Sequence, residues 1–199
     1  FPKFQVPHTF LNTFASQMPV YAFGTFFAAS VVGLYTLGAR VVLAPMMLLS
    51  GSAAKVFNEK AAALYNEGGD LHTPTVGLLG GMAKKALIPF VLFVVFAPEI
   101  FAFVFGAPWR EAGVYTQILS PWLFMVFIVS TVAFLPALYG RQRRALGIEI
   151  IYTLLRLVAL GTGVVLADVH TALALFSAAG VVVLVYNLRW ILQLTKGEA

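Results

Sequence analysis

The sequence predicts an all-α polytopic membrane protein, and three observations carry that prediction. Of its 199 residues, 60% are hydrophobic and 11% are charged, and the mean hydropathy is +0.90. A soluble domain carries about 25% charged residues, so this chain lacks the polar side chains that would cover a water-facing surface. Long charge-free runs alternate with short clusters of Lys and Arg. The chain has 0 cysteines, which excludes zinc fingers and disulfide scaffolds.

Six membrane-spanning helices are expected, forming a single six-helix lobe over residues 1–199. The charge-free run from Lys3 to Arg40 exceeds the ~20 residues of one crossing, so it holds a first helix, a turn at residues 26–30 and the start of a second. The second helix continues through residue 65 and ends at the loop-forming residues 66–70. It is therefore long enough to leave the bilayer.

The remaining spans follow the same pattern of apolar runs. The third is expected at residues 77–96, entered through Lys84 and Lys85, and a short apolar piece at residues 100–105 is expected to lie at the interface. The last three spans are expected at residues 112–140, 145–166 and 169–188.

The distribution of cations predicts the orientation. With the first span running outward, ten cations face inward and only Arg110 faces outward. The ten are Lys3, Lys55, Lys60, Lys84, Lys85, Arg141, Arg143, Arg144, Arg189 and Lys196. By the positive-inside rule both termini are cytoplasmic. The same loops account for the net charge of +5, so no nucleic-acid partner is expected. The start at Phe1 has no secretory signal, and we expect a segment of a longer protein.

The sequence offers no catalytic constellation. Neither a phosphate-binding loop nor a dinucleotide fingerprint occurs. The Ser52-x-x-Lys55 pair matches an acyl-enzyme pattern, but its companion motifs are missing. His8, His72 and His170 are scattered without a second ligand at helical spacing. We therefore expect no enzyme, no cofactor and no metal.

Two arginines lie inside expected spans, where a charge costs about 2.5 to 3.5 kcal/mol and needs a partner or a wet cavity. Arg40 precedes Pro45 by five residues and has no acidic neighbour within two turns of its helix. It either faces an aqueous cavity, where an anionic substrate binds it, or reaches the outer head groups. Arg156 lies near the middle of its span, and either faces the cavity or pairs within the bundle.

Glu149 lies seven residues before Arg156, on the same helix face and with Tyr152 between them. The rise of about 10.5 Å is too long for a direct pair. Glu149 is therefore either solvated at the cytoplasmic end or a site for a coupling ion.

The first span has a polar face formed by Asn12, Thr13, Ser16 and Gln17. Of these, Asn12 and Gln17 are candidates for substrate contact, and hydrogen bonding between helices is the alternative. The Gly77-x-x-x-Gly81 pattern predicts close packing against another helix.

Several segments together resemble a known family. They are Phe10 to Thr13 with Gln17 to Val20, Val31 to Tyr35 before Arg40 and Pro45, Glu59 to Tyr65 before Glu67 to Asp70, Phe105 to Gly113, and Gly140 to Gln142. This series resembles the C-terminal half of bacterial polysaccharide-biosynthesis flippases. These are the O-antigen and teichoic-acid exporters of the multidrug/oligosaccharidyl-lipid/polysaccharide superfamily. The resemblance covers essentially the whole chain.

The resemblance implies one six-helix lobe of a two-lobe transporter in the bacterial inner membrane, with the N-terminal lobe missing here. It implies that a polyprenyl-pyrophosphate-linked glycan crosses by alternating access among membrane lipids, without ATP hydrolysis. Arg40 before Pro45 matches the cavity arginine of related lipid II flippases, which would bind the pyrophosphate. Lys55, at the cytoplasmic end of the same helix, is a looser candidate.

Two other functions remain open. A cation-coupled drug or metabolite exporter of the same superfamily needs a membrane carboxylate, for which Glu149 is the candidate. A membrane-bound glycosyl or acyl transferase needs catalytic groups on outer loops, where only Glu99, Glu111, Asp168 and His170 lie, with no recognisable pairing.

Overall fold

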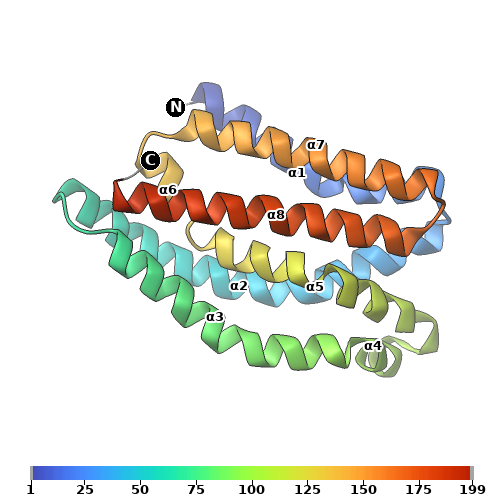
Figure 1. The fold of residues 1–199 in the computed structure, drawn as a ribbon. Coiled ribbons are helices and arrows are strands. Elements are labelled where there is room, and N and C mark those ends of the chain that lie inside the picture. The colour runs from blue at the N-terminus through green and yellow to red at the C-terminus, as the bar shows by residue number, and fades with distance from the viewer. Residues whose placement is uncertain (1, 198–199) are drawn as a thin grey trace.

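A computed structural model describes residues 2–197, including the side chains of residues 10–11 and 13–197. Within that range the chain is helical and contains no strand, so the all-α prediction is confirmed. The helices are α1 (Pro2–Phe26), α2 (Ala29–Asn66), α3 (His72–Val95), α4 (Ala97–Phe105), the 3₁₀ turn η1 (Ala107–Trp109), α5 (Arg110–Ser130), α6 (Leu135–Leu138), α7 (Gln142–Val165) and α8 (Val169–Lys196). The long helices run side by side, and both chain ends lie at the same end of the bundle (Figure 1).

Five helical segments of the described chain are long and apolar enough to cross a membrane, so the protein is polytopic as predicted. They are α2, α3, the continuous segment from η1 to α6, α7 and α8. α1 has 25 residues, which is long enough for a crossing. Its polar residues keep it out of that group, and the sixth crossing stays a prediction.

Two predicted helix boundaries are confirmed. α1 ends at Phe26 and α2 begins at Ala29, within the expected turn. α2 ends at Asn66, and Gly68 follows in the left-handed region at a φ of 68°. With 38 residues, α2 is about 57 Å long, nearly twice the ~30 Å hydrocarbon core. Part of α2 therefore stands outside the bilayer.

Other boundaries differ from the prediction. α3 begins at His72 rather than at residue 77, because Asp70 accepts hydrogen bonds from the backbone N–H groups of His72 (2.8 Å) and Thr73 (3.3 Å). The span expected at residues 112–140 is broken after Ser130. There the hydroxyl of Thr131 donates to the carbonyl of Ile128 (2.7 Å), which competes with the backbone hydrogen bonds of a helix. Pro136 has no backbone N–H to donate to the preceding turn, so it too disfavours a continuous helix.

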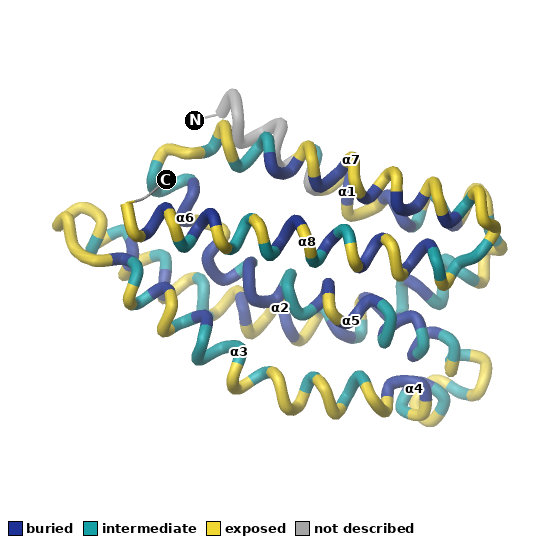
Figure 2. Tube along the Cα trace, in the orientation of Figure 1, coloured by how far each residue is buried: buried dark blue, intermediate teal, exposed yellow. Residues whose placement is uncertain are grey.

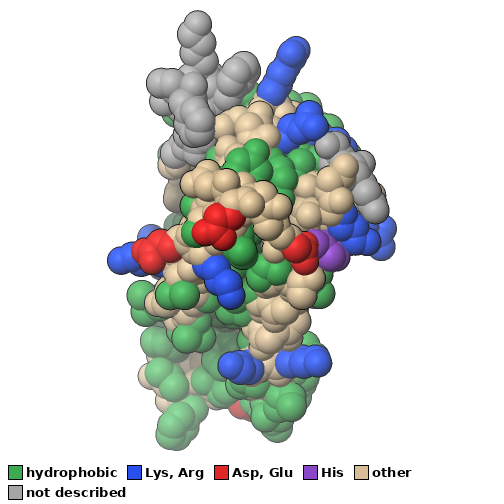
Figure 3. Space-filling view, turned by 90° about the vertical axis from the view of Figure 1, so that its left-hand side faces the viewer, with side chains coloured by type: hydrophobic (Ala, Val, Ile, Leu, Met, Phe, Trp, Pro, Cys, Tyr) green, Lys and Arg blue, Asp and Glu red, His purple; other side chains and the backbone are tan. Residues whose placement is uncertain are grey.

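Five helices form a closed ring in which α1 contacts α2, α2 contacts α5, α5 contacts α8, α8 contacts α7 and α7 contacts α1. α3 and α4 lie outside this ring, against α5 and, for α3, also α8. Buried residues follow α5 and the inner faces of the ring, whereas α3 has few buried residues and is otherwise half-buried or exposed (Figure 2). Figure 3 views the bundle from the end that carries the termini. Lys, Arg, Asp and Glu side chains are spread over this end, and hydrophobic side chains gather in the lower part of the view, where some Lys and Arg side chains also lie.

Glycines set the closest helix contacts in the ring. A Cβ on Gly38 would meet the carbonyl oxygen of Ala112 at 2.8 Å, and one on Gly163 would meet the Cβ of Ala172 at 2.2 Å. The predicted close packing at Gly77 and Gly81 is wrong, since nothing lies within 4 Å of a Cβ at either position. α3 is held elsewhere along its length, and these glycines face open space.

Candidate functional site

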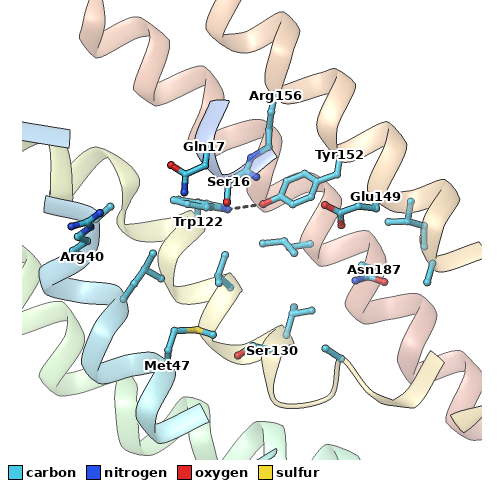
Figure 4. A pocket seen from close by; sticks show the side chains of 18 of the residues that line it. Ser16, Gln17, Arg40, Met47, Trp122, Ser130, Glu149, Tyr152, Arg156 and Asn187 are labelled. Carbon is cyan, nitrogen blue, oxygen red and sulfur yellow. Dashed lines mark hydrogen bonds between the residues drawn. The ribbon is translucent and has the colours of Figure 1, made fainter. Parts of the chain in front are cut away.

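A cavity of about 540 Å³ lies inside the ring and takes lining residues from α1, α2, α5, α7 and α8. Volumes of ~300 to 1,000 Å³ are typical of ligand sites. The polar and aromatic residues of its lining are Ser16, Gln17, Tyr35, Thr36, Arg40, Trp122, Ser130, Glu149, Tyr152, Arg156 and Asn187. Figure 4 shows ten of the lining residues by label, among them Arg40 and Arg156 on different helices.

Arg156 is held by aromatic rings. Its guanidinium carbon lies 4.2 Å from the ring centroid of Phe176, 4.4 Å from that of Tyr152 and 4.8 Å from that of Trp122. A cation over an aromatic face gains about 0.5 to 2 kcal/mol. The side chain is only 4% exposed, and its Nε has no hydrogen-bond partner in the described part of the chain. These rings thus offset part of the cost of a charge inside the bilayer.

The rings around Arg156 are themselves fixed. The Trp122 indole N–H donates to the Tyr152 hydroxyl at 2.7 Å, and Trp122 meets Phe176 edge to face with centroids 5.2 Å apart. Trp122 also lies against Gly180 of α8, where a Cβ would come within 2.4 Å of the Trp122 Cδ1. The absence of a side chain at Gly180 therefore allows Trp122 to reach its place beside Arg156.

Arg40 lines the cavity from α2, opposite α7 in the ring. It is exposed, and no ion pair of Arg40 occurs among the described residues. Arg40 is therefore a guanidinium within an apolar helix. It faces the cavity, and no carboxylate of the described residues forms an ion pair with it.

Glu149 also lines the cavity and is 8% exposed. It lies on α7, two turns before Arg156 and one turn before Tyr152. Both alternatives for Glu149, solvation and coupling-ion binding, stay predictions, and the structure shows only that its side chain is nearly buried at the wall of the cavity. Among the described residues, two arginines and one carboxylate therefore line the cavity.

The other candidate residues divide into two groups. Gln17 lines the cavity beside Ser16 (Figure 4), whereas the side chain of Asn12 lies outside the described residues. Lys55 is exposed on α2 and is not part of the cavity lining. It lies 15 residues beyond Arg40, about 22 Å along the helix.

At the end of the bundle away from the termini, the structure pairs the four groups for which the sequence showed no pairing. Arg110 donates to Glu99 at 2.6 Å, and the His170 ring lies 2.8 Å from Glu111 and 3.7 Å from Asp168. All these pairs are substantially exposed, and none of these residues lines the cavity. Asp168 also accepts from the backbone N–H groups of His170 and Thr171 as the N-cap of α8.

Sequence reasoning missed the aromatic residues of the site. Trp122 and Phe176 look like ordinary core residues in apolar helices, and nothing in their spacing relates them to Arg156. Asn187 could have been found from the sequence, because an amide within an apolar span indicates a polar environment, and it too lines the cavity. Within the described residues, no group of three His, Cys, Asp or Glu side chains has the geometry to hold a metal.

No curated protein and no solved structure matches the chain. The family model described as "Polysaccharide biosynthesis protein" matches residues 1–114. That segment contains α1 to α4 and the start of α5, and so includes Gln17 and Arg40 of the cavity. The chain belongs to the polysaccharide biosynthesis protein family, as the resemblance implied.

Proposed function

We propose that this protein transports a lipid-linked oligosaccharide across the bacterial inner membrane by alternating access. The observation that carries the proposal is the cavity inside the ring, where Arg40 and Arg156 face the same space within an apolar bundle. Membership of a polysaccharide biosynthesis family supports an oligosaccharide substrate. In this proposal both chain ends are cytoplasmic, and a second lobe of the full-length protein completes the path.

The chemistry of the substrate explains the lining. A polyprenyl pyrophosphate joined to a glycan is an anion that must avoid ~30 Å of hydrocarbon. Guanidinium groups match phosphate oxygens with paired hydrogen bonds. Arg40 lines the cavity and is exposed, so it takes the direct contact, whereas Arg156 is nearly enclosed by aromatic rings and contributes positive potential from α7.

The polar neighbours have a separate role. Ser16, Gln17 and Asn187 offer uncharged donors and acceptors along the cavity, which suits the hydroxyl groups of a sugar. Glu149 opposes the arginines and limits how tightly an anion is held, so that the substrate is released on the second side.

The test replaces Arg40 in the full-length protein. Arg40→Ala removes the countercharge, so surface polysaccharide should fall to background while the protein level in the membrane is unchanged. Arg40→Lys keeps the charge but loses the bidentate geometry, and should retain partial export. Arg143→Ala, which changes an exposed arginine outside the cavity, is the matched control and should export normally. Normal export by a stably inserted Arg40→Ala protein would contradict the proposal.

Glu149 supports a second candidate, a cation-coupled exporter of small molecules. A nearly buried carboxylate in a cavity is a site where a proton or a cation binds. In that case Glu149→Gln abolishes export of small molecules, and surface polysaccharide is unaffected. If the substrate is a lipid-linked oligosaccharide, Glu149→Gln should instead change the amount of surface polysaccharide.

A catalytic transferase role is disfavoured by the exposed pairs at the far end. Glu99 is bound by Arg110, and Asp168 caps α8. Both carboxylates therefore have structural partners, and neither lines the cavity inside the ring or the groove beside α3. We therefore propose transport rather than catalysis as the function of this protein.

A further inference from the structure

A second hollow lies outside the ring, between α2 and α3, with Phe127 of α5 at its base. Its volume is about 630 Å³, and its walls are apolar apart from one side chain, Lys85. α3 is loosely packed here, since 6% of the residues in its most apolar stretch are buried. The cavity function described above does not use this groove.

Gly77, Gly81 and Lys85 share one face of α3, because they are spaced at four-residue intervals. All three line the groove. A Cβ on either glycine would meet nothing within 4 Å. The face therefore has an open strip of backbone next to a single ammonium group, and the groove lining drawn from the described part of the chain includes no carboxylate.

Two hydrogen bonds between α5 and α3 relate the position of Lys85 along α3 to the start of α5 at Arg110. The Gln117 side chain donates to the carbonyls of Val94 and Val95, at 3.0 and 3.2 Å. Gln117 lies seven residues from the start of α5, about 10 Å along the axis, and Lys85 lies a further ten residues along α3, about 15 Å. Counted along the two helices, Lys85 is thus about 25 Å from Arg110, which compares with a hydrocarbon core ~30 Å thick. With Arg110 at one head-group level, this separation puts Lys85 near the other.

Lys84 and Lys85 are both exposed, and neither forms an ion pair within the described residues. An ammonium at this depth reaches for phosphate at the membrane surface. Below it, Ala86, Pro89 and Phe90 of α3 face Met46 of α2 along the apolar part of the groove. The stretch from Lys85 to Phe90 and beyond runs into one leaflet, whose half of the core is ~15 Å deep.

We infer that this groove holds one anionic phospholipid of the head-group leaflet nearest Lys85. Its phosphate binds Lys85 beside Gly81, and one acyl chain lies between α2 and α3. A bilayer phospholipid fits better than the longer polyprenyl carrier, because the groove is open toward the lipid and extends through one leaflet only. The bound chain fills the space between α2 and α3. This inference is independent of the proposed transport function.

The test measures lipid retention by the full-length protein in mild detergent, using native mass spectrometry. The probes are phosphatidylglycerol and phosphatidylcholine with identical chains. Wild type should retain one phosphatidylglycerol in preference to phosphatidylcholine by about tenfold, because the choline cation offsets the phosphate charge that Lys85 binds, whereas phosphatidylglycerol keeps its net negative charge. Lys85→Gln should abolish that preference, and Lys85→Arg should keep it. Gly81→Leu should fill the groove and lower retention of both lipids.

Matched controls separate the groove from general surface effects. Lys60→Gln removes an exposed cation of α2, and Gly51→Leu adds a side chain at an exposed glycine of α2; neither residue lines the groove. Both variants should retain lipid as wild type does, and so should Arg40→Ala, even if export fails. Equal retention of the two lipids by wild type, or an undiminished preference in Lys85→Gln, would overturn the inference. Displacement of phosphatidylglycerol by equimolar polyprenyl phosphate would overturn it as well.

Discussion

The cavity and the α2–α3 groove have similar volumes, about 540 and 630 Å³, but opposite surroundings. The cavity lies within a ring of helices whose glycines bring neighbouring backbones together, and its charged groups come from different helices. The groove lies beside a loosely attached helix whose glycines face open space. Tight packing fixes the position of polar groups for a specific ligand, whereas loose packing leaves a space that lipid fills.

The largest expected effect on stability is at Gly180. A Cβ there would lie 2.4 Å from Trp122 Cδ1, so Gly180→Ala should displace the indole and cost about 1 to 3 kcal/mol by overpacking. Gly161→Ala is the matched control on a neighbouring helix, with nothing within 4 Å. Thermal unfolding in detergent should show a lowered Tm for Gly180→Ala alone. Equal Tm values would mean that Trp122 is not held by this contact.

The next effect is on transport, through Arg156. Arg156→Met keeps an apolar side chain among the three rings and removes a nearly buried charge, so folding should be retained. Transport should fall about tenfold, because the positive potential that Arg156 supplies to the cavity is lost. Rates of substrate flipping in proteoliposomes measure this, with Arg189→Met, an exposed residue outside the cavity, as the control. An unchanged flipping rate in Arg156→Met would show that Arg156 contributes to packing and that its charge does not contribute to transport.

A smaller effect of opposite sign is expected at Gly77. Gly77→Ala adds a methyl group where nothing lies within 4 Å, and Ala is favoured over Gly in a helix by about 1 kcal/mol. The Tm should therefore stay level or rise. A pronounced loss of stability would show that α3 packs closely at this face, as the G-x-x-x-G pattern had predicted, and would remove the groove.

The smallest effect concerns the start of α8. The hydroxyl of Thr171 donates to Asp168, and this bond holds the pKa of the carboxyl below its ordinary value. A lowered folded-state pKa means that the ionised carboxylate stabilises the helix start above the unfolded-state pKa. That contribution is lost as the pH falls through the folded-state pKa. Hydrogen exchange at His170 and Thr171 should accelerate in Asp168→Ala relative to Asp168→Asn. Identical exchange would mean that the cap has no influence there.

Much of the fold could be predicted because charge and helix breakers mark the ends of spans. The turn before Ala29 and the end of α2 at Asn66 follow from small residues and a Gly-Gly-Asp loop. The break after Ser130 could not be predicted from hydropathy, since residues 131–139 carry no charge. It depends on local hydroxyl bonds and on Pro136.

The site could be predicted in part for a similar reason. Arg40, Arg156, Glu149 and Gln17 are polar residues in apolar helices, and such residues need a cavity, so the sequence marks them. The aromatic residues that hold Arg156 could not be identified, because Trp122 and Phe176 are equally suited to an apolar core. Their role depends on α5 and α8 meeting at Gly180, which is a tertiary contact without a local signal.

The central claim is that the ring encloses an aqueous cavity in which an anionic lipid head binds. Met47 and Leu48 are adjacent on α2 and 45% and 75% exposed, but only Met47 lines the cavity. Because this chain has 0 cysteines, Met47→Cys and Leu48→Cys can be compared directly with a membrane-impermeant thiol reagent. We predict that Met47→Cys reacts several-fold faster and that polyprenyl pyrophosphate slows it. Faster reaction of Leu48→Cys, or no protection of Met47→Cys by the pyrophosphate, would contradict the account.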